Sequence, residues 1–109
     1  METANKTESF GEVIKGAKPV LIDFYADWCG PCKMMTPILK QLREKSGDKL
    51  RILKIDIDRN PAVAEAFQIQ GVPTLILFQN GKLLWRESGV IQGDQLEKII
   101  SHYTTATST

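Results

Sequence analysis

Cysteine and histidine are scarce in this 109-residue chain, which contains two Cys and one His. Two cysteines cannot build a disulfide scaffold. A domain of this length needs none, because it buries roughly 65% of its unfolded surface. The cysteines are therefore either incidental or chemically active, and their spacing has to decide between these two possibilities.

Excess charge of one sign and long apolar runs are also missing. The formal net charge of +1 does not produce the field that nucleic-acid binding requires. The longest apolar runs, Val20–Ile22 and Leu75–Phe78, fall far short of the ~18 residues of a membrane helix. The polar segment Met1–Lys18 lacks the apolar region of a secretory signal. We therefore expect a cytoplasmic protein that neither binds nucleic acid nor inserts into a membrane.

Helical and extended patterns alternate along the chain and predict one α/β domain over residues 1–109, with frayed tails at 1–7 and 104–109. Asn80-Gly81 is a strong hairpin signal. Asn60-Pro61 is typical of a helix start, with Asn60 as the N-cap. The predicted helices are 10–14, 29–46, 61–67 and 96–103, and the predicted strands are 20–26, 50–57, 74–79 and 82–87.

Cys29 and Cys32 lie three residues apart where the second predicted helix begins, so their side chains share one face. Four interpretations compete. A zinc site would need two further soft ligands, and His102 stands alone. A structural disulfide closing so small a loop would constrain the unfolded chain little, and two buried thiols could be plain packing. Redox chemistry is favoured, because CxxC beside a strand–helix–strand pattern is a recognised redox motif.

The start of a helix gives the two cysteines different roles. Unpaired N–H groups there favour a thiolate at Cys29, and the thiolate is the form that attacks a disulfide. Cys32 lies inside the first turn, and we expect it to be less exposed and to resolve the mixed disulfide. Gly30 lets a partner backbone approach, and Pro31 has no N–H to leave unpaired.

The segment Asp23–Lys33 (DFYADWCGPCK) resembles the active-site segment of the thioredoxin family, and Gly71–Thr74 (GVPT) resembles its cis-proline loop. Asn80-Gly81 and Gly89 fall where the family has its hairpin and its substrate-side glycine. The similarity covers about Phe10 to Tyr103. It implies a thioredoxin fold with a central mixed sheet of four to five strands flanked by helices. METANKT offers almost no apolar alternation, so we expect the family's opening strand to be short, irregular or missing.

Asp23 interrupts an apolar strand, where a carboxylate is costly to bury. The resemblance makes it the buried acid beneath the cysteines, which helps to move the proton of Cys32, and makes Lys54 the lysine paired with that acid. It also implies a cis peptide bond at Pro73 and an exposed Trp28 ring at the rim. The implied apolar contact patch consists of Trp28, Ile57, Val72, Pro73, Gly89 and Val90.

Two further positions depart from the family pattern. Tyr25 stands where the family commonly carries Trp, and Val90 stands where a smaller residue is common. The first keeps an aromatic ring but changes its size and adds a hydroxyl. The second could narrow the groove that receives a partner.

The resemblance implies a thiol–disulfide oxidoreductase that reduces protein disulfides through a reversible Cys29–Cys32 couple. It further implies a monomer without bound cofactor or metal, diverse disulfide-containing clients, and electrons from an NADPH-linked thioredoxin reductase, a flavoprotein. Gly30-Pro31 matches the reducing members. An oxidase or isomerase of the same fold, a binding module and a redox sensor remain alternatives.

Overall fold

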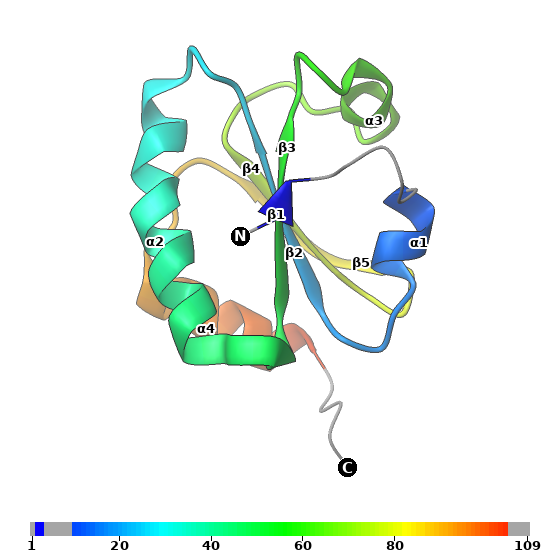
Figure 1. Ribbon diagram of the computed structural model, residues 1–109, viewed down its shortest axis with the longest axis vertical. Helices are drawn as coiled ribbons and strands as arrows, with labels where there is room; N and C mark the ends of the chain where they lie inside the picture. The colour runs from blue at the N-terminus through cyan, green and yellow to red at the C-terminus, as the bar shows by residue number, and fades with distance from the viewer. Residues whose placement is uncertain (1, 4–9, 105–109) are drawn as a thin grey trace.

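A mixed five-stranded sheet lies at the centre of the computed structural model, which describes residues 2–3 and 10–104 (Figure 1). The strand order is β1-β3-β2-β4-β5; β1, β3 and β2 run parallel, and β4 is antiparallel to both β2 and β5. The elements are β1 Glu2–Thr3, α1 Phe10–Ile14, β2 Val20–Tyr25, α2 Gly30–Ser46, the 3-10 turn η1 Gly47–Lys49, β3 Arg51–Asp56, α3 Pro61–Ala66, β4 Thr74–Gln79, β5 Lys82–Ser88 and α4 Gly93–Tyr103.

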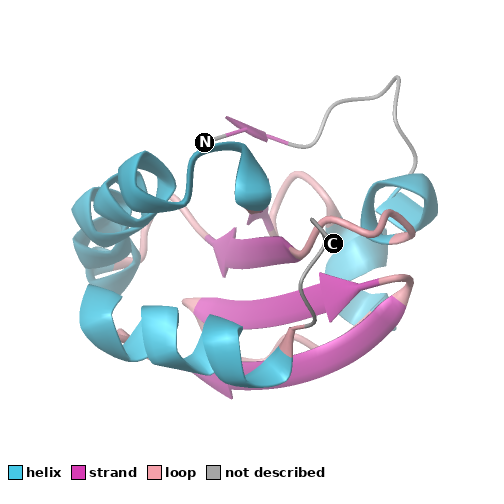
Figure 2. Cartoon of the chain, turned by 90° about the horizontal axis from the view of Figure 1, so that it is seen from below, coloured by secondary structure: helices cyan, strands magenta, loops and turns pink. Residues whose placement is uncertain are grey.

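Helices cover both faces of the sheet, so two separate cores form. In Figure 1 α2 and α4 lie on one side of the strands and α1 and α3 on the other, and Figure 2 shows the strands between helices. Side chains alternate along a strand, so Leu21 of β2 packs with α2 and α4, whereas its neighbour Ile22 packs with α1. Burial on both faces explains why β2 and β4 are almost continuously apolar.

The predicted elements agree with the observed ones to within three residues at their ends. Asn80 and Gly81 have φ values of 55° and 79°, the left-handed conformations that a tight hairpin requires. The opening strand β1 has two residues, which confirms the expectation of a short strand. Residues 1, 4–7 and 105–109 of the predicted tails lie outside the described residues.

The ends of four strands meet at one edge of the sheet. The parallel strands β2 and β3 both end there, β4 begins there at Thr74, and β5 ends there opposite it at Ser88. Asn60 in the loop after β3 occupies the N-cap position, but its side chain does not cap α3. Its amide donates instead to the carbonyl oxygen of Asp56 at 3.0 Å, which fixes the loop after β3. Loops at such an edge are favoured places for a functional site.

Candidate active site

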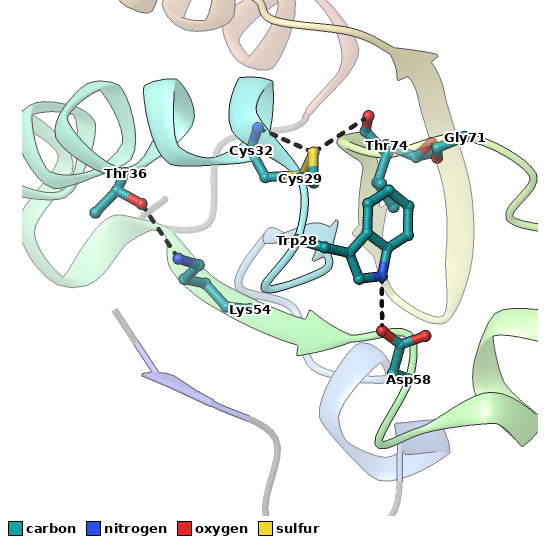
Figure 3. The surroundings of a disulfide bond; sticks show 9 residues. Trp28, Cys29, Cys32, Thr36, Lys54, Asp58, Gly71 and Thr74 are labelled. Carbon is teal, nitrogen blue, oxygen red and sulfur yellow. Dashed lines mark hydrogen bonds between the residues drawn. A yellow bond between two sulfur atoms is a disulfide. The ribbon is translucent and has the colours of Figure 1, made fainter.

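Cys29 and Cys32 form a disulfide at the N-terminus of α2, with their Cα atoms 5.3 Å apart (Figure 3). Cys29 is the N-cap residue with an extended backbone, and Pro31 stands in the first turn, where its missing N–H costs nothing. The Cys32 N–H donates to the Cys29 sulfur at 3.1 Å. The start of the helix therefore directs a backbone N–H that has no carbonyl partner within the helix at the sulfur of Cys29.

This donor separates the two cysteines chemically, whereas exposure does not. Cys29 is 4% exposed and Cys32 is 3% exposed, so Cys32 is the less exposed of the two, as expected, but the difference is too small to distinguish them. Tyr25, Ile57 and Val72 pack against the cluster that contains both cysteines, so both are buried. After reduction, an N–H at hydrogen-bond distance and the positive end of the helix dipole both favour a thiolate at Cys29.

The loop before β4 lies against the disulfide. The Val72–Pro73 peptide bond is cis, which agrees with the resemblance, and the Cys29 sulfur lies 3.6 Å from the Val72 carbonyl oxygen. The Gly89 N–H donates to the Pro73 carbonyl oxygen at 2.8 Å and ties this loop to the end of β5. Gly89 has a φ of 102°, a conformation that suits glycine.

The predicted contact patch is only partly continuous. Ile57 and Val72 are half-buried and pack against the cysteines, but Val90 packs against the core between the sheet, α2 and α4. Pro73 is buried, so it offers little surface to a partner. Its effect on the contact patch is to orient Val72. A Cβ added at Gly30 would meet nothing within 4 Å, so the backbone at the helix start is open to an approaching partner.

Trp28 is 70% exposed, as its predicted place at the rim requires. Its indole N–H donates to the Asp58 carboxylate at 2.9 Å (Figure 3). The Asp58 N–H in turn donates to the Asp56 carboxylate at 2.9 Å. Asp58 is a residue that the sequence analysis missed. The available signal was a pair of acidic residues, Asp56 at the end of β3 and Asp58 two residues later, at the functional edge of the sheet.

Asp23 is fully buried, and both of its carboxylate oxygens are without a hydrogen-bond partner among the described residues. It lies two residues after Leu21, on the face of β2 that α2 covers. Burial raises the pKa of Asp23 from 3.8 to about 6, and the positive charge of Lys54 counteracts part of this rise. The carboxyl therefore exchanges its proton close to neutral pH, as an acid–base group does.

Lys54 is the strand neighbour of Asp23 in the β2–β3 register, but it makes no direct ion pair with that carboxylate. Its ammonium donates to the Thr36 hydroxyl at 3.3 Å and lies 4.6 Å from the centre of the Tyr25 ring. The close pairing that the resemblance implies is therefore replaced by an interaction through space. Lys54, Thr36, Tyr25 and Cys32 line the same surface cavity of about 130 Å³.

Among the described residues, no three His, Cys, Asp or Glu side chains are grouped so that they could hold a metal ion. His102 is exposed and contacts the Tyr103 ring at the far end of α4. No helix within the described ranges is long and apolar enough to cross a membrane.

Comparison with known proteins matches residues 2–102 to the family model described as "Thioredoxin". A relative named "Thioredoxin Y, chloroplastic" from Oryza sativa subsp. japonica is 48% identical over 89 residues, which are 81% of this chain and 53% of the rice protein. A "Bifunctional thioredoxin reductase/thioredoxin" from Mycobacterium leprae is 45% identical over 80 residues, 73% of this chain and 18% of that protein. The chain thus spans about half of the rice protein and a small part of the mycobacterial one.

The fold is also that of known structures. A mutant thioredoxin from Halobacterium salinarum aligns with a TM-score of 0.83 and 38% identity, and the alignment covers 97% of this chain and 94% of that one. The architecture around Cys29 and Cys32 is therefore a thioredoxin fold.

Proposed function

This chain belongs to the thioredoxin family, and from that premise we propose which of its residues carry out the reduction of protein disulfides. It is a thiol–disulfide oxidoreductase with a CXXC active site, of the disulfide-reductase type. The proposal assigns Cys29 as the nucleophile and Cys32 as the resolving thiol. The observation that carries it is the 3.1 Å hydrogen bond from the Cys32 N–H to the Cys29 sulfur at the start of α2.

The reaction proceeds in two exchanges. The Cys29 thiolate attacks one sulfur of a client disulfide, which forms a Cys29–client disulfide and releases the other client sulfur as a thiolate. Cys32, deprotonated, then attacks the Cys29 sulfur, which forms the Cys29–Cys32 disulfide and releases the second client thiolate. The dithiol loses two electrons and the client gains them, and both client thiolates take up protons.

Asp23 is proposed to accept the Cys32 proton before the second exchange. Its support is full burial on the α2 face of β2 and a pKa raised by that burial to about 6. A carboxyl whose pKa lies near neutral pH is suited to accept a proton at that pH. Lys54 is proposed to moderate this group by its charge.

Client binding is proposed at the surface beside Cys29. Trp28, Ile57 and Val72 supply apolar contact, Gly89 and Val90 border it, and Gly30 leaves room for a partner backbone. An extended client segment would pair with the Val72 backbone beside cis-Pro73, as in strand addition. Backbone pairing and apolar contact demand little of the client's sequence, which suits diverse clients.

Electrons are proposed to come from an NADPH-linked thioredoxin reductase, a flavoprotein, with no cofactor bound to this chain itself. The family is generally reduced by such enzymes, and the mycobacterial relative is named as a reductase and a thioredoxin in one protein. A monomeric single domain and a cytoplasmic address remain proposals. The relative named as chloroplastic makes fractionation of cells the direct test of location.

The experiment that tests the assignment is trapping. Cys32→Ser should accumulate mixed disulfides between Cys29 and client proteins, because the resolving thiol is gone. Cys29→Ser is the matched control and should accumulate none. Mass spectrometry of the trapped species identifies the linked cysteine, and adducts through Cys32 in the control would reverse the assignment.

A further inference from the structure

The ammonium of Lys54 is held at a defined point by groups from two other elements. The Thr36 hydroxyl, one turn after Cys32 on α2, accepts a hydrogen bond from Lys54 at 3.3 Å. The face of the Tyr25 ring, at the end of β2, lies 4.6 Å from the same nitrogen. Figure 3 shows the Lys54 side chain pointing from β3 toward Thr36. A cation at this distance from a ring is attracted by its π-electrons.

Among the described residues, the Thr36 hydroxyl and the Tyr25 ring are the groups that contact the Lys54 ammonium. Lys54 is half-buried and its head group is at the surface, where a lysine ordinarily extends into water. An ammonium is strongly hydrated, so an unheld Lys54 would extend outward and away from the sheet. The two contacts oppose that movement. They keep the charge over the strand that carries Asp23.

The position of the Lys54 ammonium matters because Cys32 and Asp23 lie near it. The cavity of about 130 Å³ that Lys54 lines also contains the surface of Cys32. Asp23, the strand neighbour of Lys54, has no hydrogen bond to its carboxylate oxygens among the described residues. Among the described residues, it is therefore the positive charge of Lys54 that stabilises the ionised form of the Asp23 carboxyl.

We propose that Thr36 and Tyr25 are positioning residues, which together hold the Lys54 ammonium beside Cys32 and Asp23. This inference rests on the proposed role of Asp23 as the proton acceptor of Cys32. It means that Thr36 and Tyr25 influence the acid–base group Asp23 through the position of the Lys54 charge. Thr36 does not touch the reacting atoms and acts through Lys54.

Other charged and titratable groups border this region. Asp27 and Lys33 line the same cavity, and Asp56 and Arg59 act on the hydroxyl of Tyr25. The charge that acts on the Asp23 carboxyl, among the described residues, is that of Lys54. Release of Lys54 therefore weakens the attraction that favours the ionised carboxylate, and the pKa of Asp23 rises.

The test compares three substitutions by NMR titration of the Asp23 side-chain carboxyl in the oxidised protein. Thr36→Val keeps the shape but removes the acceptor, and should move the titration midpoint upward by about half a pH unit. Thr36→Ser keeps a hydroxyl and should titrate like the parent. Lys54→Met removes the charge and should move the midpoint in the same direction and further. Thr36 is exposed, so neither substitution there threatens folding.

Tyr25 is tested in the same way. Tyr25→Phe keeps the ring face and should leave the midpoint unchanged, whereas Tyr25→Leu removes it and should move the midpoint upward. An unchanged midpoint in Thr36→Val, beside a shifted one in Lys54→Met, would overturn the proposal for Thr36. An unchanged midpoint in Lys54→Met would overturn the proposal for both Thr36 and Tyr25.

A second measurement separates this inference from the proposed function. The rate at which Cys32 resolves a preformed Cys29 mixed disulfide is followed against pH in the parent and in Asp23→Asn. Identical pH profiles would refute the role of Asp23 as acceptor while leaving the titration result standing. If the role holds, the profile of Thr36→Val should move upward together with its NMR midpoint, and a profile that stays in place would overturn the proposed link to the reaction.

Discussion

The indole N–H of Trp28 donates a 2.9 Å hydrogen bond to the carboxylate of Asp58, which joins the loop after β2 to the loop after β3 (Figure 3). The two residues are 30 positions apart in the chain. The ring is 70% exposed, so packing on its faces does not fix its orientation. The hydrogen bond to Asp58 is the contact that orients it beside Cys29.

Removal of this hydrogen bond should impair client reduction more than stability. A ring that is no longer oriented should weaken the transition-state contacts with the client by about 0.5–1.4 kcal/mol, so Asp58→Ala should lower kcat/KM for a disulfide-bonded protein substrate by about two- to tenfold. The free energy of unfolding should change by less than about 0.5 kcal/mol, since the site is on the surface. Asp58→Asn, which keeps an acceptor oxygen, is the control. Equal losses in both variants would mean that charge, and not orientation of the ring, is what matters.

The burial of Asp23 predicts a definite dependence of stability on pH. The carboxyl titrates near 3.8 in the unfolded chain and at about 6 in the folded oxidised protein. Between these values the folded state holds a proton that the unfolded state has lost, so stability is full below pH 4 and falls as pH rises through 6. The shift corresponds to about 3 kcal/mol above pH 7.

Asp23→Asn tests this dependence because an amide does not titrate. In urea denaturation of the oxidised proteins, the variant should gain about 3 kcal/mol over the parent on going from pH 4 to pH 8. Stability profiles of parent and variant that run parallel across this range would contradict a raised pKa at Asp23.

The direction of electron flow is testable by equilibrium titration against glutathione. Thioredoxins as a family have potentials near about −270 mV, whereas a strongly oxidising disulfide catalyst lies near about −120 mV. The Gly30-Pro31 pair between the cysteines leads us to expect a value below about −200 mV for the Cys29–Cys32 couple. A higher potential would identify an oxidant and would remove the reductase assignment.

Gly89 should tolerate a side chain poorly although there is space for one. A Cβ there would meet nothing within 4 Å, but the φ of 102° is disfavoured for every residue except glycine. Gly89→Ala should therefore lower the free energy of unfolding by about 1–2 kcal/mol. Gly30→Ala is the matched control: it also has open space around it, but its backbone is helical, so it should leave stability unchanged or raise it by up to about 1 kcal/mol. Similar losses at both positions would show that φ is not the cause.

Much of this molecule could be predicted from local sequence patterns. The order of the elements follows from apolar periodicity, and Asn80-Gly81 predicts the hairpin because few other pairs adopt two left-handed conformations. The position of Cys29 and Cys32 at a helix start also follows from neighbours within a few residues. The short first strand follows from the lack of alternation in METANKT.

The contacts that tune the site could not be predicted in this way. The Trp28 indole donates to Asp58, and the Lys54 ammonium donates to Thr36 rather than to Asp23. The Val72 carbonyl oxygen lies beside the Cys29 sulfur, and Cys29 is nearly as buried as Cys32. These pairs are 18 to 43 residues apart in the chain. By itself the sequence determined the elements and the redox couple, since both depend on short-range backbone preferences. The resemblance already implied that Asp23 is buried. The tertiary structure alone decided that its carboxylate has no hydrogen-bond partner among the described residues and that Lys54 donates to Thr36, because these contacts depend on how side chains from separate elements pack together.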